Sequence, residues 1–273
     1  MPPTMNEQRF LNACRLRDEG RLTEAYSEFI QIAENAADPL DKAGALLYAA
    51  NTLEMSGQCE AATTKLNGAR ALMEAYPKAG RDERFAALEL FLDFEDANLF
   101  WLRAENLEAV LRKFEAWLRK NAQPSNDPRA RDFHTGIQTR RAFVLADLGR
   151  WKEALPILEG ITSPREYKEG IAFYLGHCYA SAHEYKKAKP YLVEALRLGL
   201  PPHLEYRAHN ELGIVYFALG GYAQAKIEFE KTLQSADPAY LKGSEILKRL
   251  EISCRQLGLK TEAEHYARRV EHP

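Results

Sequence analysis

The chain contains 273 residues, 46% of them hydrophobic, and its formal net charge is −2 at pH 7. General nucleic-acid binding needs a strongly basic surface, so this composition predicts no nucleic-acid partner. No stretch approaches the roughly 18 consecutive apolar residues of a membrane-spanning helix, and residues 1–10 contain no apolar run that suits a secretory signal. We therefore expect a cytoplasmic protein without a membrane partner.

Known catalytic and metal-binding patterns are missing from the sequence. It contains no phosphate-binding G-x-x-x-x-G-K-S/T loop, no G-x-G-x-x-G, no G-x-S-x-G and no H-E-x-x-H. The cysteines are scattered without a C-x-x-C pair, so we expect neither a zinc site nor a disulfide framework, only small apolar packing groups. They are Cys14, Cys59, Cys178 and Cys254. The sequence thus predicts no catalytic residue, no metal and no cofactor.

The first predicted elements are two helix pairs that repeat at an offset of 37 residues. Each has a small residue in the first helix, a glycine at the turn and a small residue in the second helix. These residues are Ala13, Gly20 and Ala25 in the first pair, and Ala50, Gly57 and Ala62 in the second. Pro39 and Pro77 follow the two pairs, and each should end a second helix because proline cannot continue a helix interior.

The third pair is longer. Apolar spacing predicts a first helix over residues 82–103, with Glu105 at the turn and a second helix from Leu107 to about Trp117. Three carboxylates share one side of the long helix: Glu89, Asp93 and Asp96. Such a row can bind a cation or a basic partner, but a solvated helix face is the simpler interpretation, since no Glu-x-x-His pair accompanies it.

Residues 122–129 are rich in turn-forming residues and contain no large apolar side chain. We expect a loop there, and a hinge between an N-terminal block (1–121) and a C-terminal block (130–273). The C-terminal block begins with the fourth helix pair, which turns at Gly149. Pro156 lies inside its second helix and should shorten or kink it.

The fifth and sixth pairs show the repeat most clearly, again at an offset of 37. Leu175, Gly176, Tyr179, Tyr185, Ala188, Leu192 and Pro201 return as Leu212, Gly213, Tyr216, Tyr222, Ala225, Phe229 and Pro238. Gly220 can end its helix with positive φ, whereas His183 must either adopt the same strained conformation or turn differently. The seventh pair turns at Gly258, and the polar outer face of its last helix is that of a terminal cap.

This order of residues resembles the tetratricopeptide repeat, a helix-turn-helix unit with a period of about 34 residues. Two copies match well, and the other five are degenerate but registered. The resemblance implies an all-α, right-handed superhelical solenoid of about seven repeats. It also implies a concave groove that binds a peptide or a partner protein.

In this family the first helix of each pair lines the groove. Carried over position by position, the resemblance assigns the groove to Arg140, Phe143, Phe173, Tyr174, His177, Arg207, Asn210, Phe217, Lys248, Arg249 and Arg255. The cations could hold acidic side chains or a terminal carboxylate through charge-assisted bonds. The phenylalanines offer apolar anchors, so the expected partner is a protein or peptide of acidic character.

Some relatives in the family grip the carboxylate end of chaperone tails with lysine, asparagine and arginine at fixed positions. Here Phe173 and His177 stand at the first lysine and asparagine positions, Glu211 at the second asparagine and Glu245 at a lysine, while Arg249 agrees. A chaperone-tail adaptor is therefore not expected.

The sequence predicts a non-catalytic scaffold for protein–protein interaction, with the C-terminal block as the part that binds the partner. Two alternatives stay open. One is a regulatory sensor in which a ligand changes the superhelix about residues 122–129, as in the bacterial peptide-responsive repeat proteins that it resembles. The other is an enzyme whose site is assembled from scattered groove carboxylates.

Overall fold

The computed structural model describes residues 5–103, 106–122, 128–161, 167–241 and 245–271. Within these ranges every regular element is a helix and no strand occurs. None of the described helices is long and apolar enough to cross a membrane. The chain divides into an N-terminal unit, Met1–Gln138, and a C-terminal unit, Thr139–Pro273, each with its own hydrophobic core. The predicted all-α repeat fold is confirmed.

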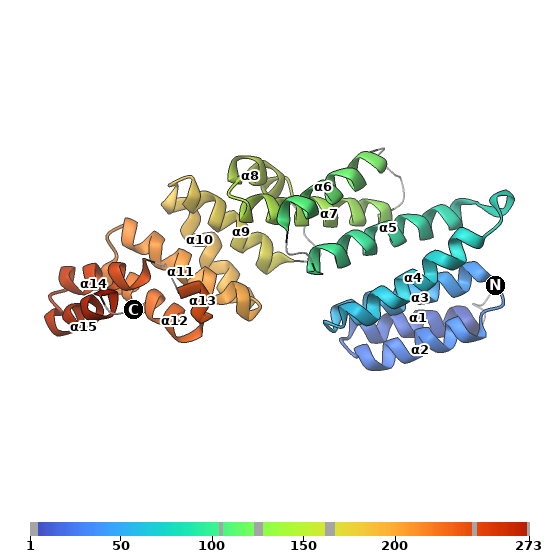
Figure 1. Cartoon of the computed structure of the whole chain (residues 1–273), viewed down its shortest axis with the longest axis horizontal. Coiled ribbons are helices and arrows are strands. Elements are labelled where there is room, and N and C mark those ends of the chain that lie inside the picture. The colour runs from blue at the N-terminus through green and yellow to red at the C-terminus, as the bar shows by residue number, and fades with distance from the viewer. Residues whose placement is uncertain (1–4, 104–105, 123–127, 162–166, 242–244, 272–273) are drawn as a thin grey trace. The chain divides into compact units, whose positions relative to one another are not determined.

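The N-terminal unit contains the first three helix pairs (Figure 1). Its helices are α1 (Met5–Asp18), α2 (Leu22–Asn35), α3 (Pro39–Met55), α4 (Cys59–Ala75), the 3-10 helix η1 (Lys78–Gly80), α5 (Glu83–Arg103) and α6 (Leu107–Lys120). The predicted break before α3 is present: Pro39 is the first helical residue, and the Asp38 side chain accepts a hydrogen bond from the Leu40 N–H (2.9 Å).

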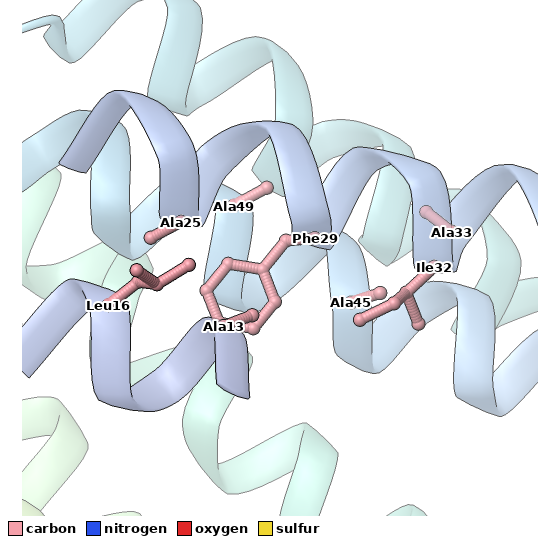
Figure 2. Close-up of a cluster of buried hydrophobic side chains, with 8 residues drawn as sticks. All are labelled: Ala13, Leu16, Ala25, Phe29, Ile32, Ala33, Ala45 and Ala49. Atoms are coloured by element: carbon pink, nitrogen blue, oxygen red, sulfur yellow. The ribbon is translucent and has the colours of Figure 1, made fainter. Parts of the chain in front are cut away.

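The core of this unit shows how small residues admit a large one. Phe29 is fully buried and lies between the alanines of neighbouring helices in Figure 2, including Ala13 of α1 and Ala45 of α3. Leu16 and Ile32 complete the same cluster. An alanine at these positions lets adjacent helices come close enough for one aromatic ring to fill the space.

The C-terminal unit contains the fifth to seventh helix pairs and most of the fourth. Its helices are the end of α7 (Pro128–Asp147), α8 (Trp151–Glu159), α9 (Lys168–Ser181), α10 (Tyr185–Leu198), α11 (Pro202–Ala218), α12 (Tyr222–Ser235), α13 (Pro238–Leu241), α14 (Ile246–Gln256) and α15 (Lys260–Glu271). Helix α8 has 9 residues against 14 in α10, as Pro156 predicts. However, α10 carries Pro190 at the same sixth position. A proline there does not by itself decide where the helix ends.

The boundary between the two units lies inside α7, between residues 138 and 139. Phe133, in the first half of this helix, stacks on Phe91 and Phe94 of α5 with ring centroids 5.3 and 4.7 Å apart. Of the predicted hinge at 122–129, residues 123–127 lie outside the described part of the chain. The predicted turn residue Glu105 also lies outside it, so both stay predictions.

Six turns between paired helices share one geometry. In each, one residue has φ between 60° and 78°, and its N–H donates to the carbonyl three residues earlier. The N–H of the next residue donates to the carbonyl five residues earlier, and all these distances are 2.8–3.1 Å. This is the Schellman ending of a helix. The residues with positive φ are Gly20, Gly57, Gly149, His183, Gly220 and Gly258.

His183 keeps the shared geometry at a cost. Its φ is 60°, so of the two options that the sequence left open it adopts the strained conformation. A side chain in this region costs about 1–2 kcal/mol relative to glycine. The imidazole Nδ1 lies 2.8 Å from the Tyr185 hydroxyl, a contact that partly offsets this strain.

Small residues also set the distance between paired helices. A Cβ added at Gly176 would lie 2.6 Å from Leu192 of α10, and one at Gly213 would lie 2.6 Å from the Phe229 ring of α12. Real side chains never approach so closely. Because Leu192 and Phe229 are fully buried, neither has room to move aside.

We predict different effects on stability for two changes at the turns. Gly220→Ala should lower the free energy of unfolding by about 1 kcal/mol, because the new Cβ meets no other atom and only the backbone is strained. His183→Gly should not lower it, since the strain is removed. Urea unfolding of both variants measures this. If Gly220→Ala left the free energy of unfolding unchanged, the turn could change its conformation without loss of stability.

We further predict that Gly213→Ala lowers the free energy of unfolding by about 1–3 kcal/mol through overpacking against Phe229. Gly68→Ala in α4 is the matched control, because its Cβ would meet Leu46 at an ordinary 3.5 Å. Alanine is the better helix former, so the control should gain about 0.5–1 kcal/mol. Thermal unfolding compares the two. Equal effects would show that the close approach does not limit packing.

Candidate functional site

The row of carboxylates on α5 is neutralised from both sides. Asp96 accepts hydrogen bonds from Arg70 of α4 (2.8 Å) and from Lys113 of α6, and Lys120 of α6 pairs with Asp93. No group of His, Cys, Asp and Glu side chains that could hold a metal occurs among the described residues. The row is therefore a network of ion pairs between neighbouring helices, and neither an open cation site nor a merely solvated face.

The eleven predicted groove residues all lie in the C-terminal unit, on α7, α9, α11 and α14. We call this set the inner face. Four of its members are buried: Arg140, Phe143, Phe173 and Tyr174 are at most 4% exposed. Tyr174 stacks on Phe143 with ring centroids 4.3 Å apart, so these rings join α9 to α7. As they stand, the two phenylalanines are core residues and offer no open apolar anchor.

The other seven members keep some contact with solvent. His177, Arg207, Asn210, Phe217 and Arg249 are half-buried, while Lys248 and Arg255 are exposed. Arg207, Asn210 and Phe217 follow one another on α11 at intervals of three and seven residues, which places them on the same side of the helix. For these residues the groove assignment stays a prediction.

The central polar contact of the inner face is formed by three successive first helices. The carboxylate of Asp147 on α7 accepts a hydrogen bond from the Tyr174 hydroxyl of α9 (2.7 Å) and another from Arg207 Nη2 of α11 (2.7 Å). The Arg207 guanidinium also lies over the Phe173 ring, 5.2 Å from its centroid. This arginine is therefore held from two directions.

The surroundings of Tyr174, Arg207 and Cys178 shift the pKa values of these three side chains. Burial, together with the nearby Asp147 charge, raises the pKa of Tyr174, so that its hydroxyl stays a donor. Burial alone would lower the pKa of Arg207, but the Asp147 carboxylate outweighs it and raises that pKa. Burial raises the pKa of the neighbouring Cys178 thiol to about 12, so it is an uncharged packing group at neutral pH.

Two further polar contacts flank this centre. His177 Nδ1 of α9 lies 3.1 Å from Glu211 Oε1 of α11. The Asn210 amide of α11 donates to the Tyr240 hydroxyl of α13 (2.9 Å). Each of these contacts joins a first helix to the next helix along the inner side.

The predicted positive character of the inner face is largely cancelled within the protein. Arg207 is paired with Asp147, Arg249 with Glu245 (2.8 Å) and Arg255 with Glu251 (2.7 Å). Sequence reasoning missed Asp147 altogether. A signal was present, because Asp147 follows Arg140 by seven residues and Phe143 by four and so shares their side of the helix.

Comparisons with solved structures establish the fold. PilF of Pseudomonas aeruginosa is similar with a TM-score of 0.55 and 14% identity over 86% of this chain and 93% of that one. The apo form of RapI is similar with a TM-score of 0.55 and 14% identity over 97% of this chain and 75% of that one. Both are of the tetratricopeptide-repeat type. The chain has a tetratricopeptide-repeat fold.

No protein-family model and no curated protein sequence matches this chain. At 14% identity the likeness to PilF and RapI shows the fold alone. The function must therefore be inferred from the residues of the inner face.

Behind the inner face, α11 is tied to α12 through Glu228. This carboxylate accepts hydrogen bonds from His209 Nδ1 (2.6 Å) and Lys231 Nζ (3.1 Å). Burial alone would raise the pKa of Glu228, but the bonds from His209 and Lys231 lower it overall from its usual 4.5. The ionised form therefore stabilises the fold above pH 4.5, and this stability is lost as the pH falls through the lower folded-state pKa.

We predict that Glu228→Gln lowers the free energy of unfolding at pH 7 by about 1–3 kcal/mol, because it removes a charged acceptor from two donors. The difference from the wild type should shrink as the pH falls below 4.5. Urea unfolding across this pH range measures it. A difference that stays constant down to the acid transition would contradict the assignment.

Proposed function

We propose that this protein is a non-catalytic scaffold for protein–protein interaction, and that a peptide or partner protein binds on the inner face of the C-terminal unit. The proposal is based on a difference in exposure between two sets of positions on α11 and α14. Core positions such as Leu212 and Leu250 are buried, whereas the adjoining inner-face positions keep polar and aromatic side chains in contact with solvent.

The chemistry of the accessible residues supports a protein partner. Phe217 is half-buried and offers an aromatic ring, a side chain that is enriched in protein interfaces. Lys248 adds an exposed cation, and no described residue forms an ion pair with it. An acidic segment of the partner would suit this cation.

A non-catalytic role fits the absence of catalytic motifs from the sequence. The Cys178 thiol, whose raised pKa keeps it protonated, is not an activated nucleophile. The cytoplasmic location expected from the sequence stays a prediction.

We predict that the double variant Lys248→Ala, Arg249→Ala loses one or more partner proteins, because these cations on α14 belong to the inner face. Affinity capture from an extract of the source organism, followed by mass spectrometry, compares it with the wild type. Retention of every partner that the wild type captures would overturn the proposed binding surface.

The matched control is Lys186→Ala, Lys187→Ala on α10. It also removes one exposed lysine and one cation that pairs along its own helix, since Lys187 contacts Glu184 at 2.6 Å. This control should capture the same partners as the wild type. Loss of the same partners in both variants would mean that only net charge matters.

A further inference from the structure

The ion pair between Arg207 and Asp147 joins helix pairs that are not neighbours. Arg207 belongs to the sixth pair and Asp147 to the fourth, and the two side chains meet at 2.7 Å across α9 of the fifth pair. In a stacked repeat array each repeat ordinarily contacts only the next one. This contact is therefore a specific feature of the inner face.

Two other arginines of the inner face, Arg249 and Arg255, pair with a carboxylate close to them in the chain. Arg249 and Arg255 pair with Glu245 and Glu251, each four residues earlier on the same helix. Such exposed pairs along one helix contribute only a few tenths of a kcal/mol. Of these three arginines, Arg207 takes its carboxylate from another helix pair.

The surroundings of Arg207 are those of a prepared anion site. The Phe173 ring supports one side of the guanidinium, and the buried Tyr174 hydroxyl holds the Asp147 carboxylate in place. The Arg207 and Asp147 side chains are nevertheless 26% and 23% exposed, so a ligand from solvent can reach both. A guanidinium offers its N–H donors as a planar fork that fits a carboxylate, so a carboxylate from solvent and Asp147 compete for the same group.

We propose that Arg207 is the residue of the inner face that binds a carboxylate of the partner, and that Asp147 occupies it as an internal substitute while no partner is bound. This inference rests on the proposed function and specifies the chemistry of its ligand. An acidic partner must displace Asp147, so the contact restrains binding. Displacement also releases the sixth helix pair from the fourth.

The substitute lowers the apparent affinity for a carboxylate, because only the fraction of molecules with a free Arg207 can bind. Asp147→Asn keeps the size of the side chain and an oxygen that can accept from Tyr174, but removes the charge that competes for Arg207. The variant should therefore bind small carboxylates about tenfold or more tightly than the wild type does.

The test uses the full chain labelled with 15N-arginine and follows the Nε–Hε NMR signal of Arg207, which is identified by its loss in Arg207→Lys. Two probes separate the possible sources of the carboxylate. N-acetyl-glutamate α-amide carries only a side-chain carboxylate, and N-acetyl-leucine only a terminal one. The expected result is a saturable shift of the Arg207 signal by at least one probe, at lower concentration in Asp147→Asn than in the wild type.

Equal affinity in the two proteins, or no response in either, would overturn the inference. So would an equal shift with N-acetyl-leucine amide, which has no carboxylate. The matched control is Glu245→Gln, which removes the carboxylate from Arg249 on the same face. Glu245→Gln should not increase the affinity for the carboxylate probes. An increase equal to that in Asp147→Asn would show that any arginine freed from its carboxylate responds in this way. Asp147→Ser replaces Asp147→Asn if thermal unfolding shows that the latter does not fold.

The two proposals fail separately. The titration contains no partner protein, so it tests the role of Arg207 and Asp147 alone. If Arg207 does not respond to the carboxylates but Lys248→Ala, Arg249→Ala selectively loses partners, only the inference about Asp147 as an internal substitute is overturned. Unchanged capture by that double variant would overturn the proposed function, whatever Arg207 binds.

Discussion

In the fifth and sixth helix pairs, the packing of the two helices depends on a glycine in the first helix. Gly176 and Gly213 leave the space that Leu192 and Phe229 fill, and an added Cβ would come within 2.6 Å of either. Since a protein interior has almost no free volume, this contact sets how closely the helices approach. The turn of shared geometry then sets where the second helix begins. One helix-pair shape results, and stacking it builds the rest of each unit.

Stacking brings the first helices of successive pairs together, and their charged side chains then meet one another. Asp147, Tyr174 and Arg207 come from three helices and form one hydrogen-bonded group. Half-buried charges need such partners, because an unpaired charge loses its hydration without compensation. The inner face is therefore nearly neutral, although its arginines alone predict a positive surface. Under the proposed function, a partner would bind by exchanging these contacts.

Much of the fold could be predicted because its determinants are local. The predicted first helix of the third pair, 82–103, is observed as α5 at Glu83–Arg103. The turn glycines have the expected positive φ. Other features were beyond the reach of pattern reasoning. Helix α13 has only four residues, too few to show a helical period. The different lengths of α8 and α10, with proline at the same position, show that tertiary packing decides how far a helix continues.

The sequence by itself determined the helix pairs, their turns and the small residues between them, because each depends on residues close together in the chain or repeated at a constant interval. Only the tertiary structure decided which inner-face residues are accessible and which charges they meet. Arg207 and Asp147 are 60 residues apart in the chain, and no periodicity links them. Their contact depends on how three helices stack, so it could not be read from the spacing of residues along the chain.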